Sequence, residues 1–235
     1  MEMVETSDER TYSNMEIMQF EQEVLANIYS EIEKRFAGID DLAHGWEHVT
    51  RVYALALHIA EQEGANRFVV AMAALMHDLG RTVQADSITH HADLSVALAK
   101  ELLATYQVSA NIQEAVLHAI IAHSFSRGIP PRTLEARIVR DADRLDSLGA
   151  IGILRWAITG TLRRTPQTKT YHPTDPFAEH HSPDDRSYML DHFFTKLLKL
   201  GDTMTTETGR ILAQQRTAFM HSYLDELRKE LEKQA

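Results

Sequence analysis

His77 and Asp78 stand side by side at the end of a stretch, residues 71–76, that is otherwise apolar. An apolar stretch of this kind predicts a buried helix, running here from about residue 67 to residue 78, and Gly80 is placed to end it. Burying a carboxylate beside an imidazole is costly unless a charge compensates both groups. A bound metal ion would supply that charge, so these two residues direct the search toward further metal ligands.

Further candidate ligands occur on two other predicted helices. His48 lies on the apolar face of a helix predicted over residues 47–63, so its imidazole is expected to point toward the interior. An acidic cluster lies in a helix predicted over residues 134–156: Asp141, Asp143 and Asp146. Imidazoles and carboxylates together form a mixed nitrogen and oxygen set. Such a set suits Mn²⁺, Fe²⁺, Co²⁺, Ni²⁺ or Mg²⁺, with positions left open for water and substrate.

Apolar residues recur at intervals of three and four along most of the chain, which is typical of amphipathic helices. No alternating pattern typical of strands and no internal repeat occurs, so we predict an all-α fold. Helices are expected over residues 16–36, 47–63, 67–78, 91–103, 111–123, 134–156, 188–200 and 206–233. Residues 159–186 are rich in Pro, Thr, His and Asp and are expected to form an irregular insertion or lid.

The composition limits the class of protein. The chain has 235 residues, of which 44% are hydrophobic and 25% charged, so we expect a flexible tail over residues 1–13 and one helical domain over residues 14–235. The absence of cysteine excludes disulfides and thiolate metal sites, and it fits a cytoplasmic location. No apolar run is long enough for a membrane span, and no signal peptide is evident. The long C-terminal helix could pack within the domain or against a second copy, forming a homodimer.

The net charge of −10 argues against a nucleic-acid polymer as the main partner, because no general basic field is available to attract phosphates. A small anion could still bind if cations gather in one pocket. No glycine-rich phosphate-binding loop of the GxxxxGK[ST] type occurs to supply backbone donors instead.

The segments around the candidate ligands resemble the H…HD…D signature of the HD superfamily of metal-dependent phosphohydrolases. The matching segments are His-Val-Thr-Arg-Val from His48, Leu-Met-His-Asp-Leu-Gly around His77, and Asp-Ala-Asp-Arg-Leu-Asp from Asp141. The resemblance continues through residues 149–152, 191–200 and 206–209, and in total it covers about residues 20–230. This longer pattern is similar to small bacterial HD proteins that are regarded as nucleotide pyrophosphohydrolases. It implies an all-α helical bundle of the HD type.

The resemblance also implies the ligands of one divalent metal ion, with Mn²⁺ favoured and Mg²⁺, Co²⁺, Ni²⁺ or Fe²⁺ as alternatives. These ligands are His48, His77, Asp78 and Asp143. Asp143 is preferred to Asp141 because the family's aspartate precedes Arg-Leu. Asp141 and Asp146 are then expected on the helix surface or behind the ligands, where Asp146 could orient one of them.

Catalytic and substrate-binding roles follow from the expected chemistry. A bound metal ion makes hydroxide available near neutral pH, and Asp78 would take part directly. Glu47 is a candidate proton-transfer partner, although the preferred explanation is a first-turn glutamate favoured by the helix dipole. Candidates for binding the substrate phosphates are His91, His123, His192, Lys196 and Lys199. Arg81 could also reach a phosphate, but we expect it to be exposed.

The basis for these phosphate candidates differs. His91 and His123 occupy places where some HD enzymes carry extra histidines for a second metal ion or the substrate. His192, Lys196 and Lys199 are spaced to share one face of the helix predicted over residues 188–200, a face that could equally be merely solvated.

The expected reaction is cleavage of a (deoxy)nucleoside triphosphate to the monophosphate and pyrophosphate. Three alternatives remain open at this point: a nucleoside 5′-monophosphatase, a di-iron oxygenase of the HD type, and a non-catalytic nucleotide sensor. The complete ligand set argues against the sensor, which has no need of a hydrolytic centre.

Overall fold

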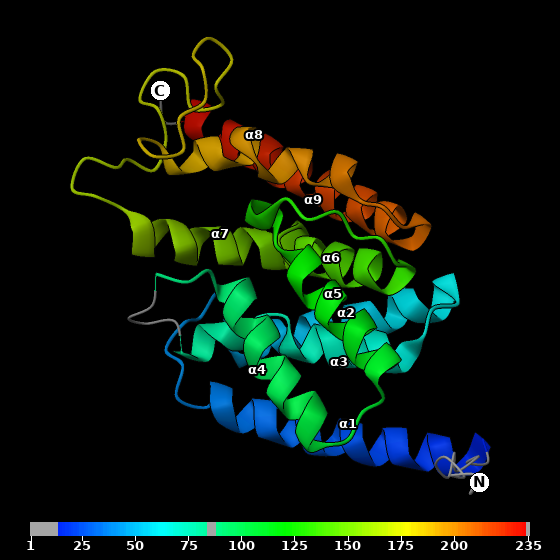
Figure 1. Ribbon diagram of the computed structural model, residues 1–235. Coiled ribbons are helices and arrows are strands. Elements are labelled where there is room, and N and C mark those ends of the chain that lie inside the picture. Colours follow the sequence, from blue (N-terminus) through cyan, green and yellow to red (C-terminus); the bar gives the residue numbers. More distant parts are fainter. Residues whose placement is uncertain (1–13, 84–87, 234–235) are drawn as a thin grey trace, which may run out of the picture.

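The computed structural model describes residues 14–83 and 88–233, and within them the fold is all-α, as predicted (Figure 1). The α-helices are α1 (Asn14–Phe36), α2 (Trp46–Glu63), α3 (Arg67–Met76), α4 (His91–Thr105), α5 (Ala110–His123), α6 (Leu134–Leu145), α7 (Gly149–Arg163), α8 (His192–Thr195) and α9 (Glu207–Glu232). Short 3₁₀ helices are η1 (Leu79–Val83), η2 (Phe125–Arg127), η3 (Met189–Asp191), η4 (Leu197–Lys199) and η5 (Gly201–Thr203). The tail expected over residues 1–13 lies outside the described residues. None of the described helices is long and apolar enough to cross a membrane.

Helix α3 is the centre of the core. Every residue from Phe68 to Met76 is buried, and α1, α2, α5 and α6 all pack against this helix (Figure 1). Alanine, leucine and methionine favour helix, and the side chain of Asn66 caps the first turn by accepting hydrogen bonds from the backbone N–H groups of Phe68 and Val69. The sequence therefore places His77 and Asp78 at the end of the most deeply buried of the described helices.

Gly80 has a different role from the one expected. Helix α3 ends at Met76, so His77 and Asp78 lie in the turn that follows it, which we call the HD turn. The backbone of Gly80 is not in the left-handed region. A Cβ atom at Gly80 would lie 2.2 Å from the carbonyl oxygen of His91 and 2.7 Å from the backbone nitrogen of Ser95. The glycine is therefore required for close packing of α4 against the HD turn, and this packing brings His91 next to Asp78.

The helix predicted over residues 134–156 is two helices. Helix α6 ends at Leu145 and α7 begins at Gly149, whose φ of +71° favours glycine over any other residue. Helix α7 then continues to Arg163, so the irregular segment begins at residue 164 and not at residue 159. The boundary was wrong because threonines in this stretch remain helical, with the hydroxyl groups of Thr159 and Thr161 donating to carbonyls one turn back.

The irregular segment, residues 164–188, is tied to its surroundings by side chains. Asp175 accepts a hydrogen bond from His181, and the other ring nitrogen of His181 lies 2.9 Å from Asp191 at the start of α8. The guanidinium group of Arg228 on α9 lies over the ring of Phe177, 4.0 Å from its centroid. These contacts anchor the segment to the start of α8 and to α9, at the upper left of Figure 1.

Asp141 is buried, so of the two places expected for it, on the helix surface or behind the ligands, the helix surface is wrong. Its Oδ2 accepts hydrogen bonds from the backbone N–H of Thr205, the backbone N–H of Thr206 and the hydroxyl of Thr206, at 2.8–2.9 Å. These donors lie at the N-terminus of α9, where a carboxylate also interacts favourably with the helix dipole. Asp141 thus fixes α9 to α6.

Substituting Gly80 by alanine should destabilise the fold by about 1–3 kcal/mol, the usual cost of overpacking, because the carbonyl of His91 has to move. The measurement is urea unfolding followed by circular dichroism. Gly38→Ala is the matched control, since nothing lies within 4 Å of a Cβ at Gly38. Equal stability of the two variants would contradict the packing role of Gly80.

Candidate metal centre

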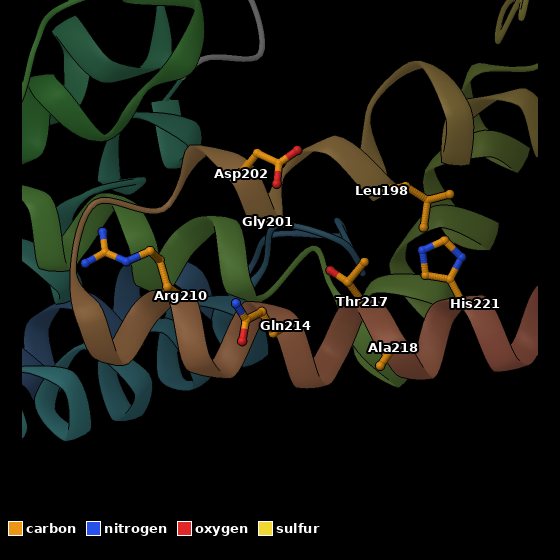
Figure 2. Close-up of a pocket in the computed structure, with 8 residues that line it drawn as sticks. All are labelled: Leu198, Gly201, Asp202, Arg210, Gln214, Thr217, Ala218 and His221. Atoms are coloured by element: carbon orange, nitrogen blue, oxygen red, sulfur yellow. The ribbon is translucent and has the colours of Figure 1, made fainter.

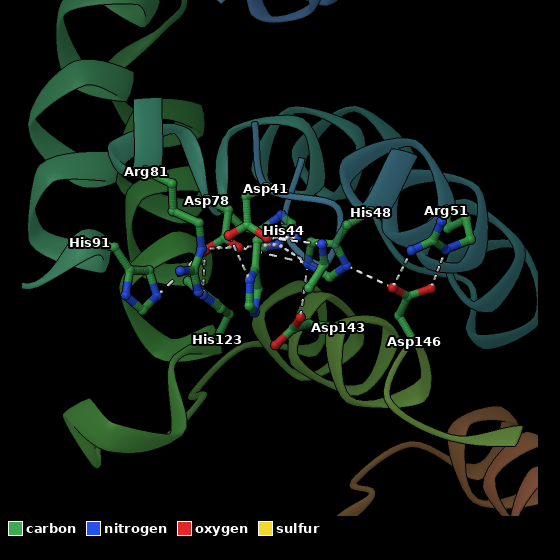
Figure 3. A network of polar contacts seen from close by, with 12 residues as sticks. Asp41, His44, His48, Arg51, Asp78, Arg81, His91, His123, Asp143 and Asp146 are labelled. Carbon is green, nitrogen blue, oxygen red and sulfur yellow. Dashed lines mark hydrogen bonds and ion pairs between the residues drawn. The ribbon is translucent and has the colours of Figure 1, made fainter. Parts of the chain in front are cut away.

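Four side chains from α2, the HD turn and the last part of α6 meet beside α3 (Figure 3). The Nε2 atom of His48 lies 3.3 Å from Nε2 of His77 and 3.4 Å from Oδ1 of Asp143. Nε2 of His48 and Nε2 of His77 each lie 3.7 Å from Oδ2 of Asp78. His48, His77 and Asp78 are buried, and Asp143 is half-buried, at the open side of the cluster.

A second group of side chains faces the other oxygen of Asp78. Oδ1 of Asp78 lies 3.5 Å from Nε2 of His91 and 3.7 Å from Nε2 of His123, which belong to α4 and α5. The ligand atoms of each group lie within 4.8 Å of one another. One group is His48, His77 and Asp78, and the other is Asp78, His91 and His123. Asp78 is therefore shared by two neighbouring groups of potential metal ligands.

The outer nitrogens of the histidines are held by acceptors. Nδ1 of His77 donates to the carbonyl of Ala74 at 2.7 Å, and Nδ1 of His123 donates to the carbonyl of Ile120 at 2.5 Å. Because a carbonyl can only accept, the proton of each neutral ring is on Nδ1. The lone pair on Nε2 therefore faces the cluster, as it does in metal-binding histidines whose other ring nitrogen donates to a carbonyl.

The cluster fits a divalent cation. Oδ1 of Asp78 is buried and has no hydrogen-bond partner among the described residues. Nε2 of His123 lies 3.7 Å away, which is too far for a hydrogen bond, so this buried oxygen lacks a donor and a cation would stabilise it. The donor set contains imidazole nitrogens and carboxylate oxygens, which suits the divalent ions expected from the sequence.

The protonation of the histidines matches this interpretation, with one exception. Burial lowers the pKa of His77 to about 4 and that of His91 to about 3, so both rings are neutral near neutral pH. The pKa of His48 is raised, because hydrogen bonds with Asp143 and Asp146 more than offset the effect of its burial. A metal ion therefore has to displace a proton from His48.

The two carboxylates remain ionised although burial alone would raise their pKa values. Interactions with His77, Arg81, His123 and His48 hold the pKa of Asp78 well below its usual range. The hydrogen bond with His48 does the same for Asp143. The candidate centre thus offers two negative charges to a cation.

Asp146 orients His48 from behind. Its Oδ2 lies 2.7 Å from Nδ1 of His48, its Oδ1 accepts from Nε of Arg51 at 2.7 Å, and Arg155 of α7 approaches Oδ2 to 3.0 Å. Asp146 is fully buried, and the two guanidinium groups offset the cost of burying its charge. The suggestion that Asp146 orients a ligand is thus matched by a direct contact.

Arg81 contacts the centre, although the sequence analysis preferred an exposed arginine to one with a role there. Its Nε donates to Oδ2 of Asp78 at 2.6 Å, and 26% of its side chain is exposed, so the expectation of an exposed arginine was wrong. The i, i+3 spacing of Asp78 and Arg81 at the end of a helix is a signal that could have identified this pair.

The structure places the predicted substrate-binding residues in two different environments. His91 and His123 join the cluster, whereas His192, Lys196 and Lys199 do not share a helix face. The chain leaves the α-helix at Lys196, with φ −136° and ψ −61°, and continues in 3₁₀ turns of three residues, which changes the angular spacing of the side chains. His192 contacts Asp185 at 2.7 Å, and both lysines are exposed.

Glu47 lies at the rim of the same region. Its side chain is 89% exposed and its carboxylate lies 3.8 Å from Arg51, the partner of Asp146. A role in proton transfer stays a prediction.

A separate pocket of about 530 Å³ lies between α9 and the turns η4 and η5 (Figure 2). Its lining includes Asp202, Arg210 and His221, and it shares no lining residue with the histidine cluster. Within the part of the chain that the structure describes, the two groups around Asp78 are the ones whose geometry suits a metal ion.

Comparison with known families places these residues in one conserved type of domain. The HD domain family profile matches residues 45–148. This span contains His48, His77, Asp78, His91, His123 and Asp143.

Relatives resemble the chain well beyond that domain. The uncharacterised protein YpgQ of Bacillus subtilis is 35% identical over 192 residues, which cover 80% of this chain and 84% of YpgQ. The crystal structure of YpgQ in complex with ADP aligns with a TM-score of 0.69 at 31% identity, covering 90% of this chain and 96% of that one. An HD-superfamily hydrolase from Bacillus thuringiensis aligns with a TM-score of 0.71 at 31% identity, covering 90% and 98%.

Metal binding is expected to release a proton at pH values below the raised pKa of His48, because the metal displaces the proton that this ring then carries. The affinity for Mn²⁺ should therefore increase as the pH rises through the pKa of His48. Asp146→Asn removes one cause of the raised pKa, so it should reduce proton release and weaken Mn²⁺ binding by about 10- to 100-fold.

Titration calorimetry in buffers with different ionisation enthalpies measures both the Mn²⁺ affinity and the number of protons released. Asp202→Asn, at the pocket of Figure 2, is the control and should leave them unchanged. Unaltered proton release in Asp146→Asn would show that Asp146 does not raise the pKa of His48.

Proposed function

We propose that this chain, which belongs to the HD superfamily of metal-dependent phosphohydrolases, cleaves (deoxy)nucleoside triphosphates between the α and β phosphates. The products would be a nucleoside monophosphate and pyrophosphate. The observation that carries the proposal is the buried carboxylate of Asp78, placed between two pairs of imidazole nitrogens. The ADP bound to the related YpgQ supports a nucleotide as the ligand.

His48, His77, Asp78 and Asp143 would hold the metal ion, with Mn²⁺ favoured. A divalent ion bound there supplies a water molecule of lowered pKa and neutralises charge on a phosphate oxygen. The low pKa values of Asp78 and Asp143 keep both carboxylates ready to bind a cation over the whole neutral range. Asp146 would keep Nε2 of His48 directed at the metal.

His91, His123 and Arg81 would act on the other side of Asp78. Nδ1 of His123 already donates to Ile120, so its Nε2 can bind a cation but cannot donate to a phosphate unless a second proton is added. His123 is therefore better suited to a second metal ion than to the direct phosphate contact expected from the sequence. His91 is partly exposed, and Arg81 lies beside it at Asp78 as a cation that could exchange its carboxylate partner for a phosphate oxygen.

The two groups of ligands around Asp78 also favour one rival function. A di-iron oxygenase of the HD type would use the same shared carboxylate with His91 and His123 as additional ligands. Two iron atoms per chain together with oxygen consumption would support the oxygenase. Hydrolysis of a nucleotide with Mn²⁺ under anaerobic conditions would instead support the hydrolase, because that reaction needs neither iron nor oxygen.

His77→Ala and Asp78→Ala should each abolish bound metal and lower turnover by at least about a thousandfold, because each removes a ligand that is held in place by buried neighbours. Metal content after dialysis, turnover and circular dichroism are measured together. His221→Ala, an exposed histidine on α9, is the matched control and should retain both metal and activity. Full activity of either variant in metal-free buffer would refute the metal centre.

A panel of nucleoside mono-, di- and triphosphates assayed with Mn²⁺, Co²⁺, Ni²⁺ and Mg²⁺ tests the reaction itself. We expect ³¹P NMR to detect pyrophosphate and the monophosphate as products of the triphosphates, because the proposed attack is at the α phosphorus. Orthophosphate released from monophosphates would instead identify a nucleoside 5′-monophosphatase. Binding of nucleotides without turnover in any of the metals would point to a sensor.

A further inference from the structure

The imidazole ring of His181, in the irregular segment 164–188, lies between two carboxylates. Its Nδ1 lies 2.7 Å from Oδ2 of Asp175, and its Nε2 lies 2.9 Å from Oδ2 of Asp191. An ionised carboxylate can only accept, so the ring makes both hydrogen bonds only when each of its nitrogens carries a proton. His181 therefore joins the segment to η3 as an imidazolium cation.

Asp191 depends on this cation because its side chain is fully buried. Its Oδ2 also accepts a hydrogen bond from the backbone N–H of Asp184 at 2.7 Å, whereas its Oδ1 is buried without a hydrogen-bond partner among the described residues. Within 4.0 Å, the described part of the chain offers Asp191 no cation besides His181. Loss of the ring's second proton would leave a buried carboxylate without a compensating charge, which is costly.

The other groups around His181 do not replace its charge. Besides the two carboxylates, the titratable and charged residues on the segment and on α9 near this ring are His172, Glu179, Asp184, Tyr188 and Arg228. The rings of His172 and Tyr188 pack against His181 at centroid distances of 4.5 and 5.8 Å. Arg228 of α9 is paired with Glu179 at 2.8 Å. The cation of α9 is thus engaged with a different carboxylate.

A second histidine attaches the segment to α8, but it titrates differently. Nδ1 of His192 lies 2.7 Å from Oδ2 of Asp185. Burial lowers the pKa of His192, so this ring is neutral near neutral pH and stays neutral as the pH rises. Of the two attachments, the one made by His181 is therefore the one that changes charge above neutral pH.

The direction of this change follows from the two hydrogen bonds. The contacts with Asp175 and Asp191 raise the pKa of His181 above its ordinary value. A group whose pKa is raised in the folded state stabilises that state fully at pH values below its ordinary pKa, and the contribution is lost as the pH rises through the raised pKa. The attachment of the segment to η3 therefore weakens as the pH rises.

The attached segment forms one wall of a cavity of about 400 Å³. The other wall is the C-terminal half of α7, and the lining includes Arg163 of α7 together with Arg164 and Arg186 of the segment. Detachment of the segment from η3 would widen this cavity and expose the surface of α7 that the segment covers.

We propose that His181 is a proton-dependent latch, whose imidazolium form holds the irregular segment 164–188 against η3. Loss of one ring proton to the solvent frees the segment and opens the cavity beside α7. The latch does not rest on the proposed reaction, because its residues lie outside the histidine cluster around Asp78.

Amide hydrogen exchange measured by NMR from about pH 6 to about pH 9 tests the latch in the wild-type protein. The reporter is the backbone N–H of Asp184, which donates to Asp191 across the contact. Its protection, corrected for the intrinsic effect of pH on exchange, should fall at least about tenfold as His181 loses its proton. Amides of α3 should keep their protection. The shift of the His181 ring proton on Cε1 gives the pKa of His181 in the same samples.

Three variants separate a titrating latch from a merely structural contact. Asp175→Asn removes one of the two negative charges, so it should move the midpoint of the change to lower pH by about one unit. His181→Gln should lower the protection of the Asp184 amide at every pH and abolish its dependence on pH. His180→Gln, which alters the exposed neighbouring histidine, is the matched control and should leave the midpoint unchanged. Circular dichroism checks that the helical domain of each variant is folded.

Three outcomes would overturn the latch, and the first two need the wild type alone. Constant protection of the Asp184 amide while His181 titrates would show that other contacts hold the segment. A neutral His181 ring at about pH 6 would place the shared proton on Asp191 instead. The same pH dependence in His181→Gln as in the wild type would assign the change to another group.

Discussion

The contact on which the rest of the structure depends is the burial of the Asp78 carboxylate between imidazoles. One oxygen faces His48 and His77, and the other faces His91 and His123. These residues come from α2, the HD turn, α4 and α5, so four separate parts of the chain converge on one charged group. A buried carboxylate without compensation would destabilise the fold. The fold tolerates this one because Arg81 donates a hydrogen bond to it and because a cation can complete the arrangement.

The packing around this carboxylate is organised to keep the site rigid. Helix α3 is buried along its whole length and ends directly before the HD turn, while Gly80 admits the backbone of α4 to within contact distance. Behind the ligands, Asp146 joins His48 to two arginines. Stability and metal binding are therefore coupled, since the same apolar packing that supports the core determines where the Nε2 atoms lie.

The sequence by itself determined the all-α fold, the buried α3 helix and the residue types of the centre, because these follow from short-range periodicity and from a rare combination of buried polar residues. The sequence pattern indicated His48, His77, Asp78 and an acidic cluster, and the HD resemblance selected Asp143 in preference to Asp141.

The errors lie where local signals are weak: the break between α6 and α7 at Gly149, the helical continuation to Arg163, and the 3₁₀ turns that separate His192 from Lys196 and Lys199. Only the tertiary structure placed one oxygen of Asp78 against each pair of histidines and brought Arg81 onto that carboxylate. It also buried Asp141 under α9 and placed Arg163, Arg164 and Arg186 around one cavity. Such arrangements depend on how helices far apart in the sequence pack against one another, and no pattern within a single helix specifies the distance between two of them.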